Sequence, residues 1–125
     1  MTRPAPWTDE ENSAVVALYF IMLDHAIAGE KYNKAAMIRR EQEQLDLDHP
    51  DGQRVPWLAD RSRGSIEAKL MNVTGVLIDL GRDDVSMAEH GYRPMSNYQS
   101  DLKTMVVGLL AVRDEAVAGG FEAQA

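Results

Sequence analysis

The chain repeats its apolar residues at helical spacing in four segments, and the first of them is predicted to form a helix from Asp9 to Ala28. Thr8 and Glu11 form a capping-box pattern at its start, and Gly29 is placed to end it. Trp7, just before the cap, has the position of a hydrophobic staple. The residues expected on the core stripe are Val15, Tyr19, Met22, Leu23 and Ile27.

A second helix is predicted from Lys34 to about Leu45, with Asn33 as its N-cap. Its apolar residues are few, so we expect it on the outside of the bundle. The stretch that follows, "DLDHPDGQRVPWLADRSRG", is rich in Pro, Gly and Asp and is predicted to be a loop. The side chains expected to anchor this loop to the core are Val55, Trp57 and Leu58.

A third helix, predicted from Ser65 to Gly81, is apolar on two opposite faces. Such a helix is either central in the fold or in contact with a partner. The first face comprises Ile66, Leu70, Val73, Leu77 and Leu80, and the second comprises Met71, Thr74 and Ile78.

The last helix is predicted from Asn97 to Ala118, after a capping pattern of Ser96 and Gln99. Gly119 and Gly120 are expected to end it. Its expected core stripe is Tyr98, Leu102, Met105, Leu109 and Val112.

The chain shows no alternating strand pattern with hairpin chemistry and no internal repeat. We therefore predict an all-α fold, a compact bundle of about four main helices with two long loops. Residues 1–125 form a single domain in this prediction, with flexible tails at 1–7 and 119–125.

Composition narrows the functional classes. The chain has 125 residues, of which 45% are hydrophobic, and it has no cysteine. The missing thiols exclude disulfides, thiol catalysis and zinc–thiolate sites. The first residues lack the apolar core of a secretory signal, and the apolar runs are too short to cross a membrane. We expect a cytoplasmic protein that does not act at a membrane.

The net charge of −7 opposes non-specific binding to nucleic acid, but the charges are unevenly distributed. Residues 31–69 carry eight basic and seven acidic side chains, whereas the rest of the chain carries five basic and thirteen acidic ones. Any contact with phosphate is therefore expected in this middle third.

Catalytic and metal-binding patterns are absent from the sequence. "DLDHPDG" resembles a calcium-binding loop, but Pro50 occupies a ligand position and no glutamate follows at the required distance. His25, His49 and His90 lack the spacing of a zinc site, and no nucleophile elbow or phosphate-binding loop is present. We expect no enzyme activity, no metal, no cofactor and no small-molecule substrate.

The start of the third helix has the side chains of a nucleic-acid recognition helix. Two arginines precede it, its first turn supplies backbone N–H groups, and an asparagine suited to reading adenine lies one turn beyond a lysine. These residues are Arg61, Arg63, Ser65, Lys69 and Asn72. A second group expected nearby comprises Tyr32, Asn33, Lys34, Arg39 and Arg40.

The order of several motifs resembles a family. "WTDEENSAVVALYFIML", "GEKYNKAAMIRR", "RSRGSIEAKLMNVTGVLIDLG" and "GYRPMSNYQ" follow one another over residues 7–112. The series resembles a small helical domain at the front of some bacterial HNH-endonuclease and restriction-defence proteins, here expected to stand alone. It implies a defence-associated accessory role that concerns DNA or a nuclease partner. Leu70 and Met71 replace a His-Gln pair of the family pattern, which removes two polar groups from the third helix.

Two hypotheses follow. The first is a non-catalytic DNA-binding module in a bacterial or phage defence context, which uses the two groups of residues named above. The second is a protein-interaction module, acting as a homodimer, as a nuclease subunit or as an acidic inhibitor of a nucleic-acid-binding partner. The two-sided third helix and the net charge of −7 favour the second.

Overall fold

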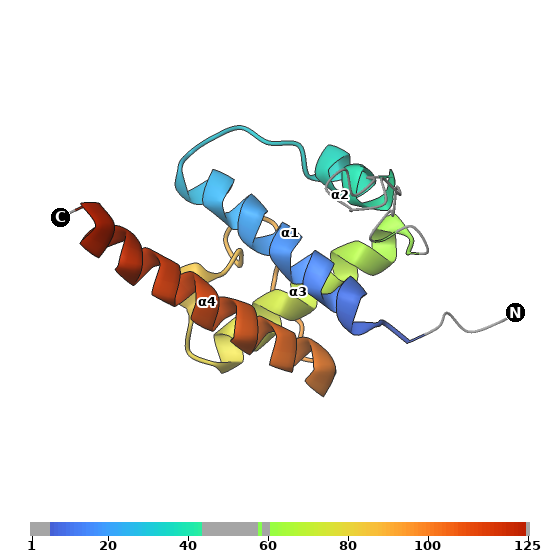
Figure 1. Ribbon diagram of the computed structural model, residues 1–125. Coiled ribbons are helices and arrows are strands. Elements are labelled where there is room, and N and C mark those ends of the chain that lie inside the picture. The colour runs from blue at the N-terminus through green and yellow to red at the C-terminus, as the bar shows by residue number, and fades with distance from the viewer. Residues whose placement is uncertain (1–5, 44–57, 59–60, 125) are drawn as a thin grey trace, which may run out of the picture.

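The computed structural model describes residues 6–43, 58 and 61–124, and for 119–124 it describes the backbone alone. The described residues form helices and no strand, which confirms the all-α prediction (Figure 1). The elements are α1 (Asp9–Ile27), α2 (Lys34–Glu43), α3 (Arg63–Asp79), the short 3₁₀ helix η1 (Asp83–Val85) and α4 (Ser100–Gln124).

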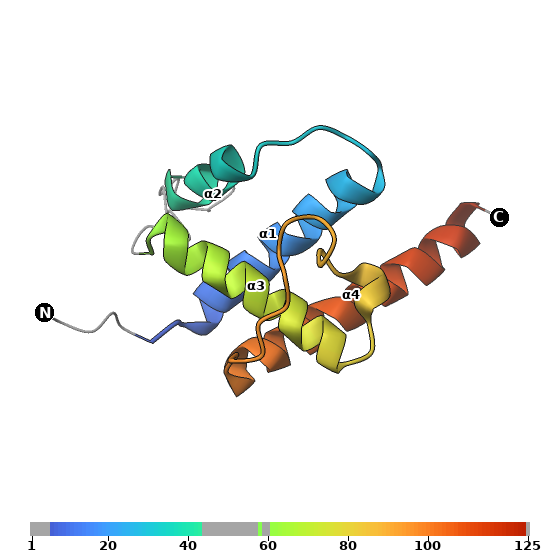
Figure 2. The same cartoon turned by 180° about the vertical axis from the view of Figure 1, so that it is seen from behind.

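Helix α3 occupies the centre of the bundle. It packs against α1, α2 and α4, and the segment that leads to α4 crosses its opposite side (Figure 2). Met95 N–H donates to the Met71 carbonyl at 3.1 Å, so this segment is bonded directly to the α3 backbone. The two apolar faces of α3 are thus explained by its central position within the chain.

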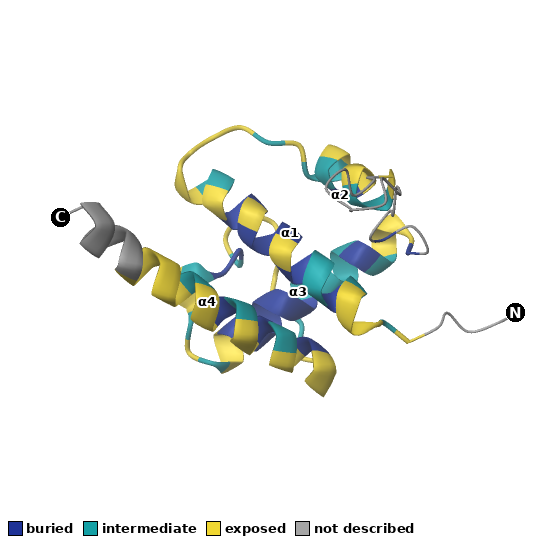
Figure 3. Ribbon diagram, viewed as in Figure 1, coloured by how far each residue is buried: buried dark blue, intermediate teal, exposed yellow. Residues whose placement is uncertain are grey.

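Both faces of α3 contribute buried residues. Ile66, Leu70, Val73 and Leu77 are fully buried, as expected for the first face. On the second face Thr74 is also fully buried, whereas Ile78 is 37% exposed. Figure 3 shows the middle of α3 as continuously buried. The helix begins at Arg63, two residues earlier than predicted, because Ser62 rather than a later serine caps it.

A buried hydroxyl joins three parts of the core. Tyr19 Oη in α1 lies 2.9 Å from Thr74 Oγ1 in α3 and accepts a hydrogen bond of 2.6 Å from Met87 N–H. All three residues are fully buried, so these bonds satisfy polar groups that would otherwise be costly inside the core. Burial raises the pKa of the Tyr19 hydroxyl.

The predicted capping box at the start of α1 is confirmed. Glu11 N–H donates to Thr8 Oγ1 at 3.1 Å, and Thr8 N–H donates to Glu11 Oε1 at 2.9 Å. Gly29 takes a left-handed conformation with φ of 70° just after the helix ends. Ile27 was predicted in the core but is 62% exposed, because it lies at the last turn, beyond the buried part of α1.

The register and the end of α4 differ from the prediction. Its buried residues are Leu102, Val106 and Leu110, whereas Val112 is 61% exposed. The helix begins at Ser100 and continues through the predicted stop at 119–120 to Gln124. Glycine ends a helix when it turns left-handed, and the two glycines at 119–120 instead stay helical.

The predicted loop is only partly described. Leu58 is fully buried, and its N–H donates to the Glu41 carbonyl at 3.1 Å, which confirms it as an anchor. Val55, Trp57 and the predicted end of the second helix at Leu45 lie outside the described residues.

Candidate functional site

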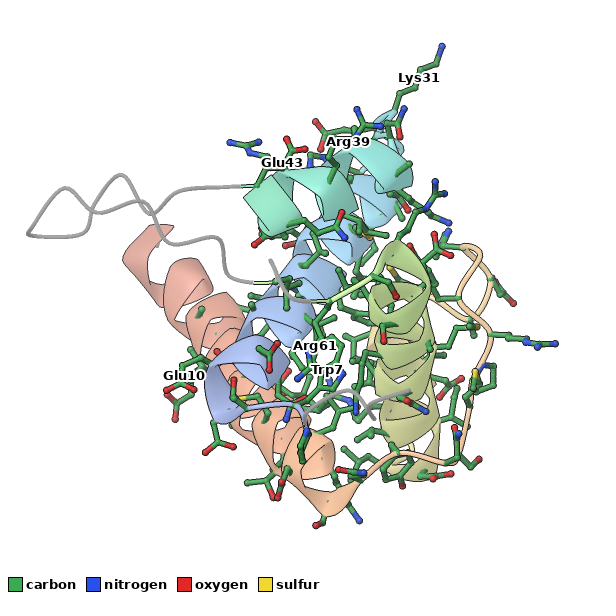
Figure 4. The ribbon with its side chains drawn as sticks, turned by 90° about the vertical axis from the view of Figure 1, so that its right-hand side faces the viewer. Trp7, Glu10, Lys31, Arg39, Glu43 and Arg61 are labelled. Atoms are coloured by element: carbon green, nitrogen blue, oxygen red, sulfur yellow. The ribbon has the colours of Figure 1, made fainter. Side chains whose placement is uncertain are left out.

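Arg61, the first residue of the predicted recognition group, is buried between α1 and α3 (Figure 4). Its Nε and Nη2 donate to the two carboxylate oxygens of Glu11 at 2.6 and 2.8 Å. Nη2 also donates to the Pro6 carbonyl at 3.0 Å, and the guanidinium lies 4.9 Å from the centre of the Trp7 ring. The hydrogen bond from Arg61 is the main cause that lowers the pKa of Glu11. Arg61 therefore ties the start of α1 to the start of α3.

Lys69 lies on the same aromatic ring. Its Nζ is 5.2 Å from the centre of Trp7, and the side chain is half-buried. Burial lowers the pKa of Lys69, the positive charge of Arg61 adds to the effect, and Asp101 opposes it. Trp7, the predicted staple, packs against the core in contact with these two cations.

Asn72 is 6% exposed and is bonded inside the fold. Its Nδ2 donates to the Met95 carbonyl at 3.2 Å and to Asn97 Oδ1 at 2.8 Å. The amide thus holds the segment before α4 against α3, and it does not face a surface where a base edge would meet it. Ser65, in the first turn, donates its backbone N–H to Ser62 Oγ at 3.1 Å.

Three members of the second predicted group also serve the fold. Asn33 Oδ1 accepts from Ala36 N–H at 3.0 Å, so it caps α2 as predicted. The ring of Tyr32 stacks on His25 with centroids 5.7 Å apart. Lys34 Nζ donates to the His90 carbonyl and lies 4.7 Å from the centre of the Tyr92 ring.

The remaining predicted residues point to solvent. The side chain of Arg63 is 61% exposed and pairs with Glu67 at 3.0 Å, one turn along α3. Arg39 and Arg40 are exposed on α2, and Figure 4 shows Arg39 and Lys31 on the same outer side. The ten predicted residues therefore do not gather on one exposed surface, and their role in binding stays a prediction.

A groove lies beside α1 that sequence reasoning missed. A hollow of about 490 Å³ has an apolar floor from α1 and a polar rim from α1 and α2. A second hollow of about 220 Å³ shares Leu18, Ile21 and Glu41 with it and extends to Met37 and Arg40. We call the two together the α1 groove. Its floor is Ala14, Ala17, Leu18 and Ile21, and its rim is Asp9, Glu10, Ser13 and Glu41.

The floor of the α1 groove follows from the sequence of α1. Ala14, Ala17, Leu18 and Ile21 recur at i, i+3, i+4 and i+7, so they share one side of the helix. Leu18 belongs to the core and is 2% exposed, whereas Ala17 is exposed and Ile21 is 47% exposed. The signal for the groove was that "AVVALYFIML" is apolar all round, although only part of such a helix faces the core.

The rim of the α1 groove is mainly acidic. Asp9 and Glu10 are exposed, and Figure 4 shows Glu10 directed away from the bundle. Glu41 is partly buried, and its carboxylate has no hydrogen-bond partner among the described residues. Burial raises the pKa of Glu41, against the opposing charge of Arg40. The groove thus presents carboxylates to whatever occupies it.

Within the described ranges no group of three or more His, Cys, Asp or Glu residues is placed to hold a metal ion. The calcium-like stretch that contains Asp46, Asp48, His49 and Asp51 lies outside these ranges. In the part of the chain that the structure describes, no helix is both long and apolar enough to cross a membrane.

No known protein-family model, curated protein or solved structure matches the chain. The resemblance to a defence-associated helical domain accordingly stays a prediction.

Proposed function

We propose that the chain is a non-catalytic interaction module that binds a protein partner along the α1 groove. The observation that carries the proposal is the open hollow with a floor of Ala14, Ala17, Leu18 and Ile21. Ala17 and Ile21 expose apolar surface there, and apolar surface enclosed by a polar rim marks binding sites on soluble proteins. In the defence setting implied by the sequence resemblance, a separately encoded nuclease subunit is a partner of the expected kind.

The positions of the predicted recognition residues in the fold support the same proposal. Arg61 and Asn72 are buried in bonds within the chain, and Lys69 is half-buried on an aromatic ring. The donors of Arg61 and Asn72 are bonded within the fold, the Lys69 ammonium lies over the Trp7 ring, and the chain carries a net charge of −7. An acidic module with its central cations engaged internally is poorly suited to bind phosphates.

DNA binding is the second candidate, and one observation favours it. Arg39 and Arg40 on α2 and the nearby Lys31 are exposed, and Figure 4 shows Arg39 and Lys31 on one side of the molecule. Three exposed cations are a small electrostatic footprint, since each phosphate contact adds little alone. This candidate therefore rests on α2 rather than on α3.

The proposed function is tested by selection from a displayed library of random peptides. Each peptide is about 16 residues long, which is enough for a helix to span the groove. The library is selected against the full chain, and each selected peptide is titrated into the wild type, Ala17→Lys and Val112→Lys. Both variants add the same charge, but Val112 is an exposed residue of α4 that does not line the groove. We expect Ala17→Lys alone to abolish binding.

Two outcomes contradict the proposed function. One is a library that yields no peptide with saturable affinity. The other is a set of peptides that Ala17→Lys leaves unaffected. In parallel, a labelled duplex and a labelled single strand are titrated at low salt, where we expect affinity no tighter than about 100 µM. The DNA candidate would be established instead if the chain bound either DNA with micromolar affinity and the double substitution Arg39→Ala, Arg40→Ala removed this binding.

A further inference from the structure

We infer that the segment that fills the α1 groove is an amphipathic helix with an apolar stripe and with lysine or arginine on its flanks. The inference rests on the proposed function and adds to it the chemistry of the partner. It follows from the shape of the floor, from the backbone groups available at the groove and from the charges on the rim.

The floor fits a helix. Ala14 and Ala17 are small, which lets a second backbone approach α1 closely, and Ile21 forms a larger ridge one turn further on. From Asp9 to Ile21 the groove follows about 18 Å of α1 at 1.5 Å per residue, the length of about 12 residues of a partner helix. A partner with apolar residues at i, i+3, i+4 and i+7 matches this row.

An extended segment is a poorer occupant. Extended peptides gain affinity by adding a strand to the edge of a sheet, and the described residues form no strand. The floor of the groove is the side of a regular helix, in which the backbone N–H and C=O groups bond to one another. A helical partner satisfies its own backbone and needs only side-chain contacts there.

The rim determines the charge of the partner. Asp9, Glu10 and Glu41 place three carboxylates around the floor, and Arg40 is the one cation among the lining residues described. The carboxylate of Glu41 is partly buried without a hydrogen-bond partner among the described residues, which leaves it ready to accept from a cation. Lysine or arginine on the partner satisfies this group and complements the acidic rim.

Three helical peptides that share one leucine stripe test the inference. Their flanking positions carry lysine, glutamine or glutamate, and each is titrated into the full chain by fluorescence anisotropy. We expect the lysine peptide to bind about tenfold more tightly than the glutamine peptide, and the glutamate peptide to bind most weakly. We expect Glu41→Gln to reduce the ratio of the affinities of the lysine and glutamine peptides several-fold.

The charge of the whole chain is controlled with matched variants. Ile21→Lys and Val112→Lys change the net charge equally, but only Ile21 lines the groove. We expect at least a tenfold loss of lysine-peptide affinity in Ile21→Lys and less than a twofold loss in Val112→Lys. An equal loss in both variants would mean general charge attraction and would overturn the inference.

The remaining outcomes separate the inference from the proposed function. If the glutamine or glutamate peptide binds the groove as tightly as the lysine peptide, the inference fails and the proposed function stands. If no peptide binds and the displayed library also fails, both fail. A dimer of the chain that Ile21→Lys dissociates would assign the groove to a second copy. In another variant, residues 44–57 are replaced by a glycine–serine linker. If this variant binds the peptide more tightly, the groove is assigned to the chain's own segment 44–57. Either result overturns the inference.

Discussion

At the scale of single residues, Glu11 has two structural roles. It is the third helical residue of α1, where its side chain completes the capping box with Thr8. The same carboxylate accepts two hydrogen bonds from Arg61, fifty residues later in the chain. The side chains of Arg61 and Glu11 are only 6% and 13% exposed, so this ion pair lies largely out of water. Removal of one partner leaves the other charge buried and uncompensated.

Arg61→Ala is therefore expected to lower the free energy of unfolding by about 3 kcal/mol. Arg63→Ala is the matched control, because the side chain of Arg63 is 61% exposed and its pair with Glu67 is a surface one. We expect a change of about 0.5 kcal/mol or less there. The free energies of unfolding of both variants are measured by urea titration, with circular dichroism as the signal. Equal effects at the two positions would show that Arg61 does not join α1 to α3.

The same pair predicts a pH dependence of stability. The pKa of Glu11 lies below its ordinary value of 4.5 in the folded chain, mainly because of the hydrogen bond from Arg61. A lowered folded pKa contributes stability that is present above the unfolded pKa and is lost as the pH falls through the folded one. We expect the free energy of unfolding to fall as the pH drops below about 4.5, and to fall less steeply in Glu11→Gln.

Urea titrations of both proteins between about pH 3 and pH 6 provide the measurement. At the upper end of this pH range the wild type should have the larger free energy of unfolding. At the lower end the free energies of unfolding of the two proteins should converge. Parallel curves across the range would refute the assigned role of Glu11.

At the scale of elements, the central feature is the contact between α3 and the segment that crosses it. Gly75 permits this contact, since a Cβ atom there would lie 2.7 Å from the Met95 carbonyl carbon and closer still to its oxygen. Asn72, one turn earlier, donates to the same carbonyl. The glycine and the asparagine together fix the path of the chain into α4.

Gly75→Ala is expected to destabilise the fold by about 2–3 kcal/mol, because a backbone carbonyl must move to admit the methyl group. Gly108→Ala is its control on the exposed side of α4, where a Cβ atom meets nothing within 4 Å. That change should instead stabilise by about 0.5–1 kcal/mol through helix propensity. Thermal unfolding of both variants decides the point, and a stabilised Gly75→Ala would contradict the described packing.

The sequence predicts most of the elements because local signals place them. Thr8 and Glu11 locate the start of α1 to the residue, and Asn33 does the same for α2. The register of α4 is harder, because its apolar residues allow two stripes and only the packing of α1 and α3 selects Leu102, Val106 and Leu110.

The candidate site is less predictable than the elements. Arg61, Lys69 and Asn72 have the side-chain types of a recognition helix, yet each bonds or stacks with residues far away in the chain. Spacing along a helix does not reveal such partners, because they depend on the tertiary fold. The α1 groove escapes prediction for the same reason, since its rim joins α1 to Glu41 of α2.

At the scale of the whole molecule, charge and shape point to the same kind of partner. The chain carries twenty acidic and thirteen basic residues, and the basic residues Arg61 and Lys69 contact Glu11 and Trp7 within the fold. The acidic excess is left to the surface, where it lies beside an apolar groove. Under the proposed function, we expect long-range attraction to steer a basic partner toward the molecule and the apolar floor to provide the contact area.

Amide chemical-shift mapping tests the central claim most directly. The lysine-flanked peptide is titrated, unlabelled, into the ¹⁵N-labelled full chain, and the shift of each backbone amide is followed to saturation. We predict that the largest shifts fall on residues 9–21 of α1 and 37–41 of α2, which line the α1 groove. Shifts concentrated at the start of α3 or along α4, with α1 unchanged, would contradict the account.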